Sequence, residues 1–123
     1  MKWVIGLLGI ILTASLVFAM PAKRPTMLTW DPPTTNTDGT PLTDLSGYKV
    51  YWSTTSGSYS DVKSKDVGNV VKADIKVITG SYDVDYYFVV TAYDTFKNES
   101  AFSNEVSSKD PLVPGAPGNL KKL

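Results

Sequence analysis

The chain has 123 residues, of which 42% are hydrophobic, and it contains neither cysteine nor histidine. That length allows one compact domain. The missing cysteines exclude disulfides and thiolate metal sites, and the missing histidines exclude Ser-His and Cys-His catalysis. Between residues 27 and 110, seven lysines face twelve acidic residues, a difference of minus five. A nucleic-acid-binding surface needs the opposite sign. We therefore expect no nucleic-acid partner, no cofactor and no enzymatic activity.

Residues 1–19 have the composition of an export signal that would form a helix. Lys2 precedes an apolar run, and a second apolar run ends at Ala19, with small residues where a signal peptidase would cut after Ala19. The alternative is an uncleaved anchor, because the apolar length approaches that of a bilayer. An uncleaved anchor would place Lys23 and Arg24 on the exported side of the membrane, where positive charge is disfavoured. These two residues therefore favour cleavage. We expect a secreted, periplasmic or cell-surface protein, with a membrane partner only if the segment is retained.

The first half of the remaining chain predicts two strands separated by a long loop. After a short linker (residues 20–26), residues 27–30 are predicted to form a short strand. It should end at the two prolines that follow, because proline has no backbone amide to donate to a sheet. Residues 32–46 are rich in Thr, Asn, Asp, Gly and Pro, which is typical of a surface loop. Residues 47–53 alternate, with Tyr48, Val50 and Trp52 facing inward and Lys49, Tyr51 and Ser53 facing outward.

The second half predicts four more strands. Residues 59–67 indicate an edge strand that lysines protect from edge-to-edge pairing. Residues 71–78 alternate and predict a half-exposed strand with Ile75 and Val77 on one face. Residues 86–94 predict a central strand whose two faces both carry β-forming side chains, and residues 102–108 a last strand with Val106 facing inward. The core is predicted to contain Trp30, Tyr48, Val50, Tyr86, Phe88 and Val90.

Short strands at this spacing predict an all-β sandwich, and four runs make the prediction more specific. They are LTWDPP (residues 28–33), GYKVYW (47–52), YYFVVTAYD (86–94) and NESAFSNEV (98–106). Together they resemble the fibronectin type III domain of bacterial and phage exported proteins. The resemblance implies an Ig-like two-sheet β-sandwich over residues 27–110. It also implies that Trp30 is the core tryptophan and that the Tyr86 hydroxyl bonds nearby backbone. The family's Arg-Gly-Asp adhesion tripeptide is absent from the loop before the last strand.

The resemblance leaves the first strand of the family, strand A, truncated or missing. After cleavage only residues 20–26 remain for it, so the edge of the following strand would be unpaired. The Pro- and Gly-rich tail, residues 111–123, looks like the beginning of another family domain. One interpretation is a disordered remnant of a repeat array. The other is a strand donated to a neighbouring subunit, which would assemble the chains head to tail.

Three outward tyrosines, Tyr51, Tyr87 and Tyr93, are the candidate ligand-binding residues. Neighbouring aromatic rings on a sheet face can stack on sugars or enter protein pockets, although they can also act only as cross-strand pairs that stabilise the sheet. No metal site is predicted, because the acids in and beside the long loop match no calcium-loop spacing.

The expected function is an exported, non-catalytic binding or spacer module that presents a rigid β-sandwich surface to a protein or glycan. The alternative is a structural subunit that donates its C-terminal tail as the missing strand A. Fold resemblance alone does not identify the partner.

The export signal can be tested directly. We expect the exported protein to begin at Met20, because cleavage after Ala19 removes the apolar segment. Intact-mass spectrometry of the exported protein measures this, and a species that retains Met1 would establish the anchor instead.

Overall fold

The computed structural model describes residues 24–110 and 112–123. Arg24–Lys109 form one compact unit, and the described residues beyond it contain no helix or strand. The predicted export signal and its cleavage site lie outside the described residues. Within the described ranges, no helix is long and apolar enough to cross a membrane.

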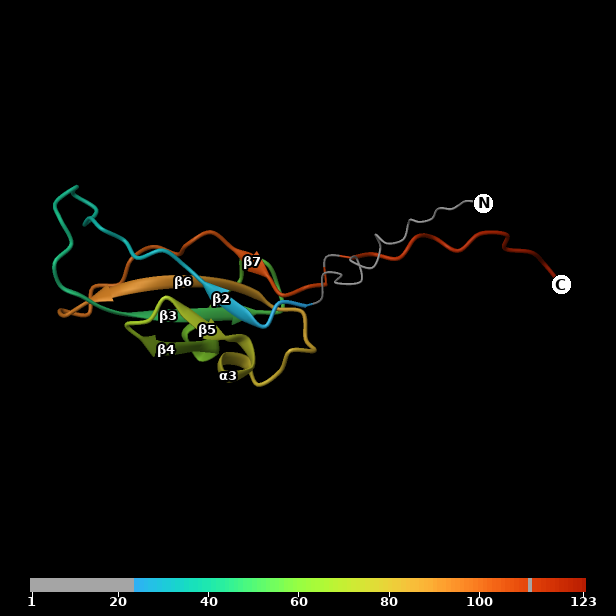
Figure 1. Cartoon of the computed structure of the whole chain (residues 1–123), viewed down its shortest axis with the longest axis horizontal. Helices are drawn as coiled ribbons and strands as arrows, with labels where there is room; N and C mark the ends of the chain where they lie inside the picture. Colours follow the sequence, from blue (N-terminus) through green and yellow to red (C-terminus); the bar gives the residue numbers. More distant parts are fainter. Residues whose placement is uncertain (1–23, 111) are drawn as a thin grey trace, which may run out of the picture. The chain divides into compact units, whose positions relative to one another are not determined.

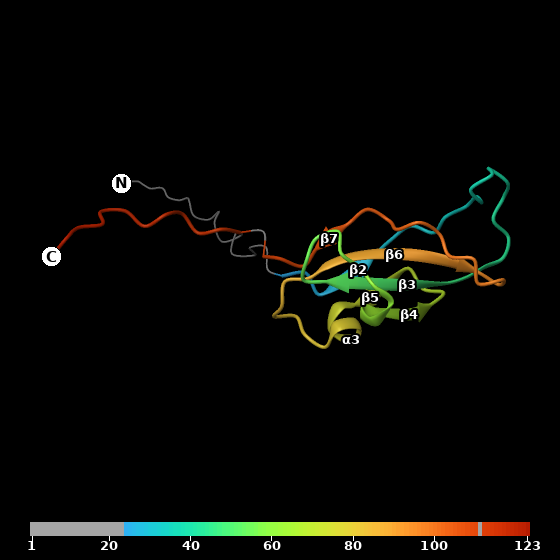
Figure 2. The same cartoon turned by 180° about the vertical axis from the view of Figure 1, so that it is seen from behind.

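The larger sheet has four antiparallel strands in the order β4-β3-β6-β7. β3 (Leu45–Ser53) and β6 (Tyr87–Asp94) form its centre and run side by side along the unit (Figures 1 and 2). β4 (Ser64–Gly68) and β7 (Val106–Ser107) are its edges. In the register of the central pair, Val50 lies opposite Val90. The strands of this pair are the two whose alternation in the sequence is longest.

A second, smaller sheet pairs β2 (Met27–Thr29) with β5 (Lys72–Asp74), also antiparallel. Leu28 of β2 packs with Val50 and Phe88 of the larger sheet, so the two sheets enclose a common core. The prediction of an all-β protein built from two antiparallel sheets is confirmed.

The core consists of apolar side chains from both sheets and from the short helix after β5. Its buried members are Leu28, Val50, Ile75, Ile78 and Phe88. Of the six residues predicted for the core, three are buried and three are partly buried against it: Tyr48, Val50 and Phe88, and then Trp30, Tyr86 and Val90. The Trp30 and Tyr48 rings pack with centroids 5.4 Å apart.

The prediction of one strand over residues 71–78 is wrong, because β5 ends at Asp74 and the helix α3 (Ile75–Thr79) follows. The Asp74 carboxylate accepts a hydrogen bond from the Lys76 amide at 2.8 Å, as an N-cap does. Gly80 ends the helix with a φ of 92°, a left-handed conformation that glycine adopts at little cost. Asp74 and Gly80 therefore set the two ends of this five-residue helix.

The helix changes which side chains face the core. Ile75 and Ile78, three residues apart, share its buried face, whereas Val77 points to solvent and is 69% exposed. A strand would have placed Ile75 and Val77 on one face. The short apolar run fits both the periodicity of a helix and that of a strand, and only the flanking residues distinguish the two structures.

The two outer strands are shorter than predicted. β4 is preceded by a 3-10 turn, η1 (Asp61–Lys63), and β7 contains two residues. Val106 lies opposite Phe88, on the core side of the sheet as predicted, but it is 44% exposed. The chain before β7 follows β6 through serine hydroxyls. Ser103 Oγ accepts from the Val90 amide, and Ser100 Oγ from the Ala92 amide, each at 2.9 Å. These hydroxyls replace the carbonyls of a regular ladder, so no continuous strand forms.

The Tyr86 ring packs edge-on against Phe88 with centroids 6.1 Å apart. Within residues 24–110 and 112–123, the Tyr86 hydroxyl has no hydrogen-bond partner. The backbone bond that the family resemblance implies for this hydroxyl is therefore not seen in the described part of the chain.

Substitutions in α3 distinguish the helix from a strand. Ile75→Ala should lower the free energy of unfolding by about 2–5 kcal/mol, because it leaves a cavity in the core. Val77→Ala, the matched control, should change it by no more than about 0.5 kcal/mol, because the side chain is exposed. Urea unfolding measures both values. Equal losses at the two positions would favour the alternating strand.

Candidate functional site

The structure places the three candidate tyrosines in three separate surroundings. They come from β3 and β6 and lie on the face of the larger sheet that points away from the core. Tyr87 and Tyr93 are half-buried. Tyr51 is only 4% exposed, so the expectation that it projects into solvent is wrong. The reason is that residues 98–105 run along the edge of β6 and direct the side chains of Glu99 and Phe102 over this outer face.

Tyr51 is held under this returning segment by Glu99. Its hydroxyl donates a hydrogen bond to Glu99 Oε2, and Thr91 Oγ1 donates to the same oxygen at 2.7 Å. Lys49 Nζ lies 3.7 Å from Glu99 Oε1. The Phe102 ring covers Tyr51 edge-on, with centroids 5.1 Å apart. Tyr51 is therefore part of the sheet's packing and offers no face to a ligand.

Glu99 is stabilised as a carboxylate in this position. Burial favours its neutral form, but the hydrogen bonds from Tyr51 and Thr91 and the charge of Lys49 outweigh it and lower the pKa of Glu99. Burial, together with the bond to Glu99, raises the pKa of Tyr51. Glu99 is therefore an ionised carboxylate that accepts a hydrogen bond from the neutral phenol of Tyr51, and this bond stabilises the packing of the sheet.

Glu105 organises the neighbouring part of the outer face in a similar way. Its carboxylate accepts from Ser56 Oγ at 2.6 Å, from the Gly57 amide at 2.8 Å and from the Tyr59 hydroxyl. The bond from Ser56 is the main reason why the pKa of Glu105 is lowered. The turn after β3 is thus fixed to the segment before β7, and the Tyr59 ring packs edge-on against Phe102 at 5.6 Å.

These contacts create an aromatic cluster on the outer face, which we call the Phe102 cluster: Tyr51, Tyr59, Phe102 and Tyr87. Burial raises the pKa of Tyr59 above its ordinary value, and the nearby Tyr87 adds to the effect. Tyr51 forms the base of the cluster. Phe102, at its centre, is 52% exposed, and Tyr59 and Tyr87 are half-buried. The sequence indicated Tyr51 and Tyr87 but not Tyr59, which begins the predicted edge strand, or Phe102, which begins the predicted last strand.

Tyr93 lies apart from this cluster, because it reaches across β3 to β4. Its hydroxyl donates to the Asp66 carboxylate, at 2.9 and 2.8 Å from the two oxygens. The ring passes directly over Gly47, where a Cβ atom would lie 2.4 Å from the hydroxyl oxygen. The Gly68 amide and then Tyr93 lower the pKa of Asp66. Gly47 is therefore the residue that allows this three-strand contact.

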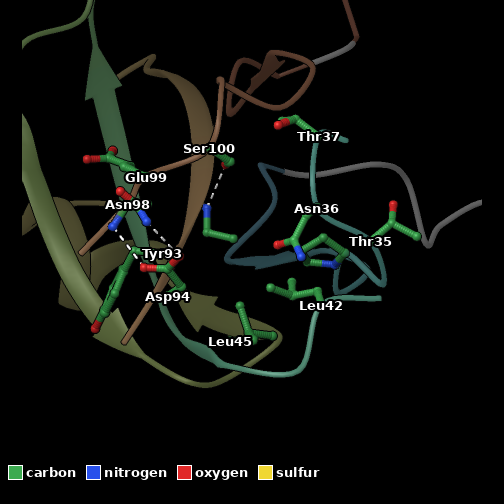
Figure 3. A pocket seen from close by; sticks show the side chains of 12 residues that line it. Thr35, Asn36, Thr37, Leu42, Leu45, Tyr93, Asp94, Asn98, Glu99 and Ser100 are labelled. Carbon is green, nitrogen blue, oxygen red and sulfur yellow. Dashed lines mark hydrogen bonds between the residues drawn. The ribbon is translucent and has the colours of Figure 1, made fainter. Parts of the chain in front are cut away.

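A groove of about 310 Å³ lies at the end of the unit, between the long loop and the turn after β6. Figure 3 shows Thr35, Asn36 and Leu42 on one wall and Asp94 and Asn98 on the other. The Asp94 carboxylate accepts from the Asn98 amide at 2.9 Å and from its side chain at 3.0 Å. Asn36 Nδ2 is used within its own loop. The sequence gives no signal for this groove, because two distant loops form it.

The loop acids do not converge on a metal. Asp38 accepts hydrogen bonds from the backbone and hydroxyl of Thr40, and Asp44 accepts one from Thr95. Among the described residues, no three acidic side chains form a group that could hold a metal ion. Asp38 instead closes a turn, as Asp commonly does, and Asp44 connects the long loop to the turn after β6.

Comparison with known proteins gives one partial similarity. Over 76 residues, 62% of this chain, it is 33% identical to a part of an amylopullulanase of Thermoanaerobacter thermohydrosulfuricus. The chain spans only 5% of the length of that relative. No family model matches the chain, and no solved structure matches it.

The role of Glu99 predicts a specific pH dependence. The pKa of Glu99 is lower in the folded chain than in the unfolded chain, so its stabilisation is complete above the unfolded pKa of about 4.3 and is lost as the pH falls through the folded pKa. Glu99→Gln should reduce the free energy of unfolding by about 1–2 kcal/mol at pH 7. The variant should also lose less stability than the parent chain as the pH falls below about 4.

Urea unfolding at a series of pH values measures this effect. Asp61→Asn is the matched control, because that side chain is 87% exposed at the surface, 3.9 Å from Lys49. If both variants retained the acid slope of the parent chain, Glu99 would not be the group responsible.

Proposed function

We propose that the chain is an exported, non-catalytic module of fibronectin type III kind that presents a rigid β-sandwich surface to a glycan or protein. In this proposal it is secreted, periplasmic or attached to the cell surface. The resemblance is supported by where its four runs fall in the fold. They form β2 and Trp30, β3, β6, and the segment that follows β6 to β7. The first strand of that family has no counterpart among the described residues.

The Phe102 cluster is the observation that carries the binding proposal. The Phe102 ring is half-exposed on the sheet face, Tyr59 packs edge-on against it, and Tyr87 lies near Tyr59. A half-exposed aromatic ring such as that of Phe102 can stack on the apolar face of a sugar ring, and a neighbouring tyrosine is suited to a contact that is partly apolar and partly wet. Glu105 fixes Tyr59 in place, so little side-chain freedom would be lost on binding.

The carboxylates beside the cluster support a non-catalytic role. A glycosidase of the common two-carboxylate kind needs one acid with a raised pKa that can donate a proton. Glu99 and Glu105 are the two glutamates of the chain, and the pKa of each is lowered by donors from surrounding side chains. Both carboxylates are therefore acceptors within the fold and are poorly suited to acid catalysis.

The similarity to an amylopullulanase favours a glycan over a protein as the partner. That relative is named as an enzyme acting on polysaccharide, and the similar segment is 5% of its length. A share of this size suits an accessory module better than a catalytic domain, which needs a cleft that a small sandwich rarely contains. We therefore propose an α-glucan such as pullulan as the first ligand to test.

Binding can be measured by affinity electrophoresis through gels that contain pullulan. We expect the parent chain to be retarded, and Phe102→Ala to weaken binding about tenfold because it removes the central ring. Tyr87→Ser should weaken it less. Phe96→Ala is the matched control and should bind normally, because Phe96 is an 81% exposed aromatic residue in the turn after β6, outside the cluster.

Two results would contradict the proposal. One is retardation that Phe102→Ala and Phe96→Ala reduce equally. The other is the absence of retardation of the parent chain in pullulan, starch and other glycans tested in the same way, which would leave a protein as the partner. Thermal melting of each variant confirms that a loss of binding does not come from unfolding.

A further inference from the structure

The strand β2 uses one of its two edges within the described residues. On the side of β5, the Trp30 amide donates to the Val71 carbonyl at 3.0 Å, and the Ile75 amide donates to the Thr26 carbonyl at 2.8 Å. Hydrogen bonds alternate along an antiparallel pair. Residues 26, 28 and 30 therefore direct their backbone groups toward β5.

The intervening residues direct theirs the other way. By the same alternation, the amides and carbonyls of Met27 and Thr29 point to the opposite edge of β2. No described residue pairs with them there. Both residues are exposed, so an arriving extended segment could reach these groups. This arrangement is the template on which a further strand can form.

The side of the unit next to this edge is hollow. A cavity of about 360 Å³ lies between β2 and the segment that leads into β7, and one of about 190 Å³ lies beside the residues that follow β2. The larger is lined by apolar groups of both sheets, among them Leu28, Phe88 and Val106. Trp30 and Asp31 line both cavities. A segment added to β2 would therefore place alternate side chains into an apolar space next to one acidic residue.

Two polar atoms in this region lack partners. Trp30 Nε1 and the Tyr48 hydroxyl are buried, and neither has a hydrogen-bond partner within the described ranges. Both side chains line the smaller cavity. Buried polar groups in folded proteins are almost always paired. Among the described residues, no segment on this side of the unit supplies acceptors to these two groups.

The tail of the chain has the chemistry that the cavities require. Residues 112–123 have no helix or strand, and their apolar side chains are exposed. Leu120 is 98% exposed. It precedes Lys121 and Lys122, and no acidic residue follows Asp110. The end of the tail is thus an apolar residue next to positive charge, and the cavities are apolar with Asp31 at their wall.

We propose that residues 120–123 of one copy of the chain add to the open edge of β2 in a second copy. Leu120 enters the larger cavity beside Val106, and Lys121 or Lys122 lies near Asp31. The donated tail and the accepting edge are different surfaces, so the contact is heterologous and builds open head-to-tail chains. This inference does not depend on glycan binding, because the Phe102 cluster is on the other face of the larger sheet.

Complementary variants test the proposal. Leu120→Asp removes the anchor of the tail but leaves the edge intact. Met27→Pro removes an edge amide at the first residue of β2, where no ladder bond to β5 is lost. Sedimentation equilibrium of the full chain should give a mass that rises with concentration. Each variant should associate at least about tenfold more weakly than the parent. An equal mixture of the two should form dimers and nothing larger, because each variant retains one functional half.

The matched control is Val113→Asp, which places the same charge on an exposed apolar residue of the same tail, outside the proposed strand. It should associate as the parent does. Three results would overturn the proposal: a parent chain that remains monomeric at about millimolar concentration, a Val113→Asp variant as defective as Leu120→Asp, or a mixture that fails to dimerise. A tail that folds back onto its own β2 would give the first result, with the Met27 amide protected from hydrogen exchange.

Discussion

The pairing of β3 with β6 is the contact on which the rest of the structure depends. After a register shift between Leu45 and Gly47, the two strands stay in register from Gly47 opposite Tyr93 to Ser53 opposite Tyr87. Both faces of the pair therefore present a continuous surface of β-forming side chains. The inner face, with Val50 and Phe88, is covered by the β2–β5 sheet and α3. Part of the outer face is covered by side chains of the segment that runs along the edge of β6, among them Glu99 and Phe102. Every other element is therefore placed by its contact with one face or one edge of this pair.

The two faces are stabilised by different chemistry. The inner face buries apolar side chains, as a chain without disulfides must. On the outer face, carboxylates from the returning segment and from β4 accept hydrogen bonds from tyrosine and threonine hydroxyls. Each of these carboxylates, Glu99 and Asp66, thereby connects its own segment to a neighbouring strand of the sheet. Clusters of lowered pKa values often mark active sites. Here they mark the attachment of a loop to a sheet.

The sequence determined the central strands and their faces, because the alternation in residues 47–53 and 86–94 is long and β-branched or aromatic. It did not determine α3, since Ile75 and Ile78 fit a helix and Ile75 and Val77 fit a strand. The deciding signals were the caps, Asp74 and Gly80. The burial of Tyr51 and the groove between the loops could not be predicted, because both depend on segments far apart in the sequence that meet only in the folded chain.

The edges of the unit are protected to different degrees, and this difference bears on how the chain meets other molecules. β4 carries Lys65 and Asp66, and its register with β3 shifts at Tyr48. Charges and irregular register both discourage the addition of a strand. β7 has two residues and offers little to pair with. The open edge of β2 carries Met27 and Thr29, which are uncharged, and an apolar hollow lies beside it. Natural sheets usually cover or charge such an edge. Among the described residues, the outer edge of β2 has neither protection.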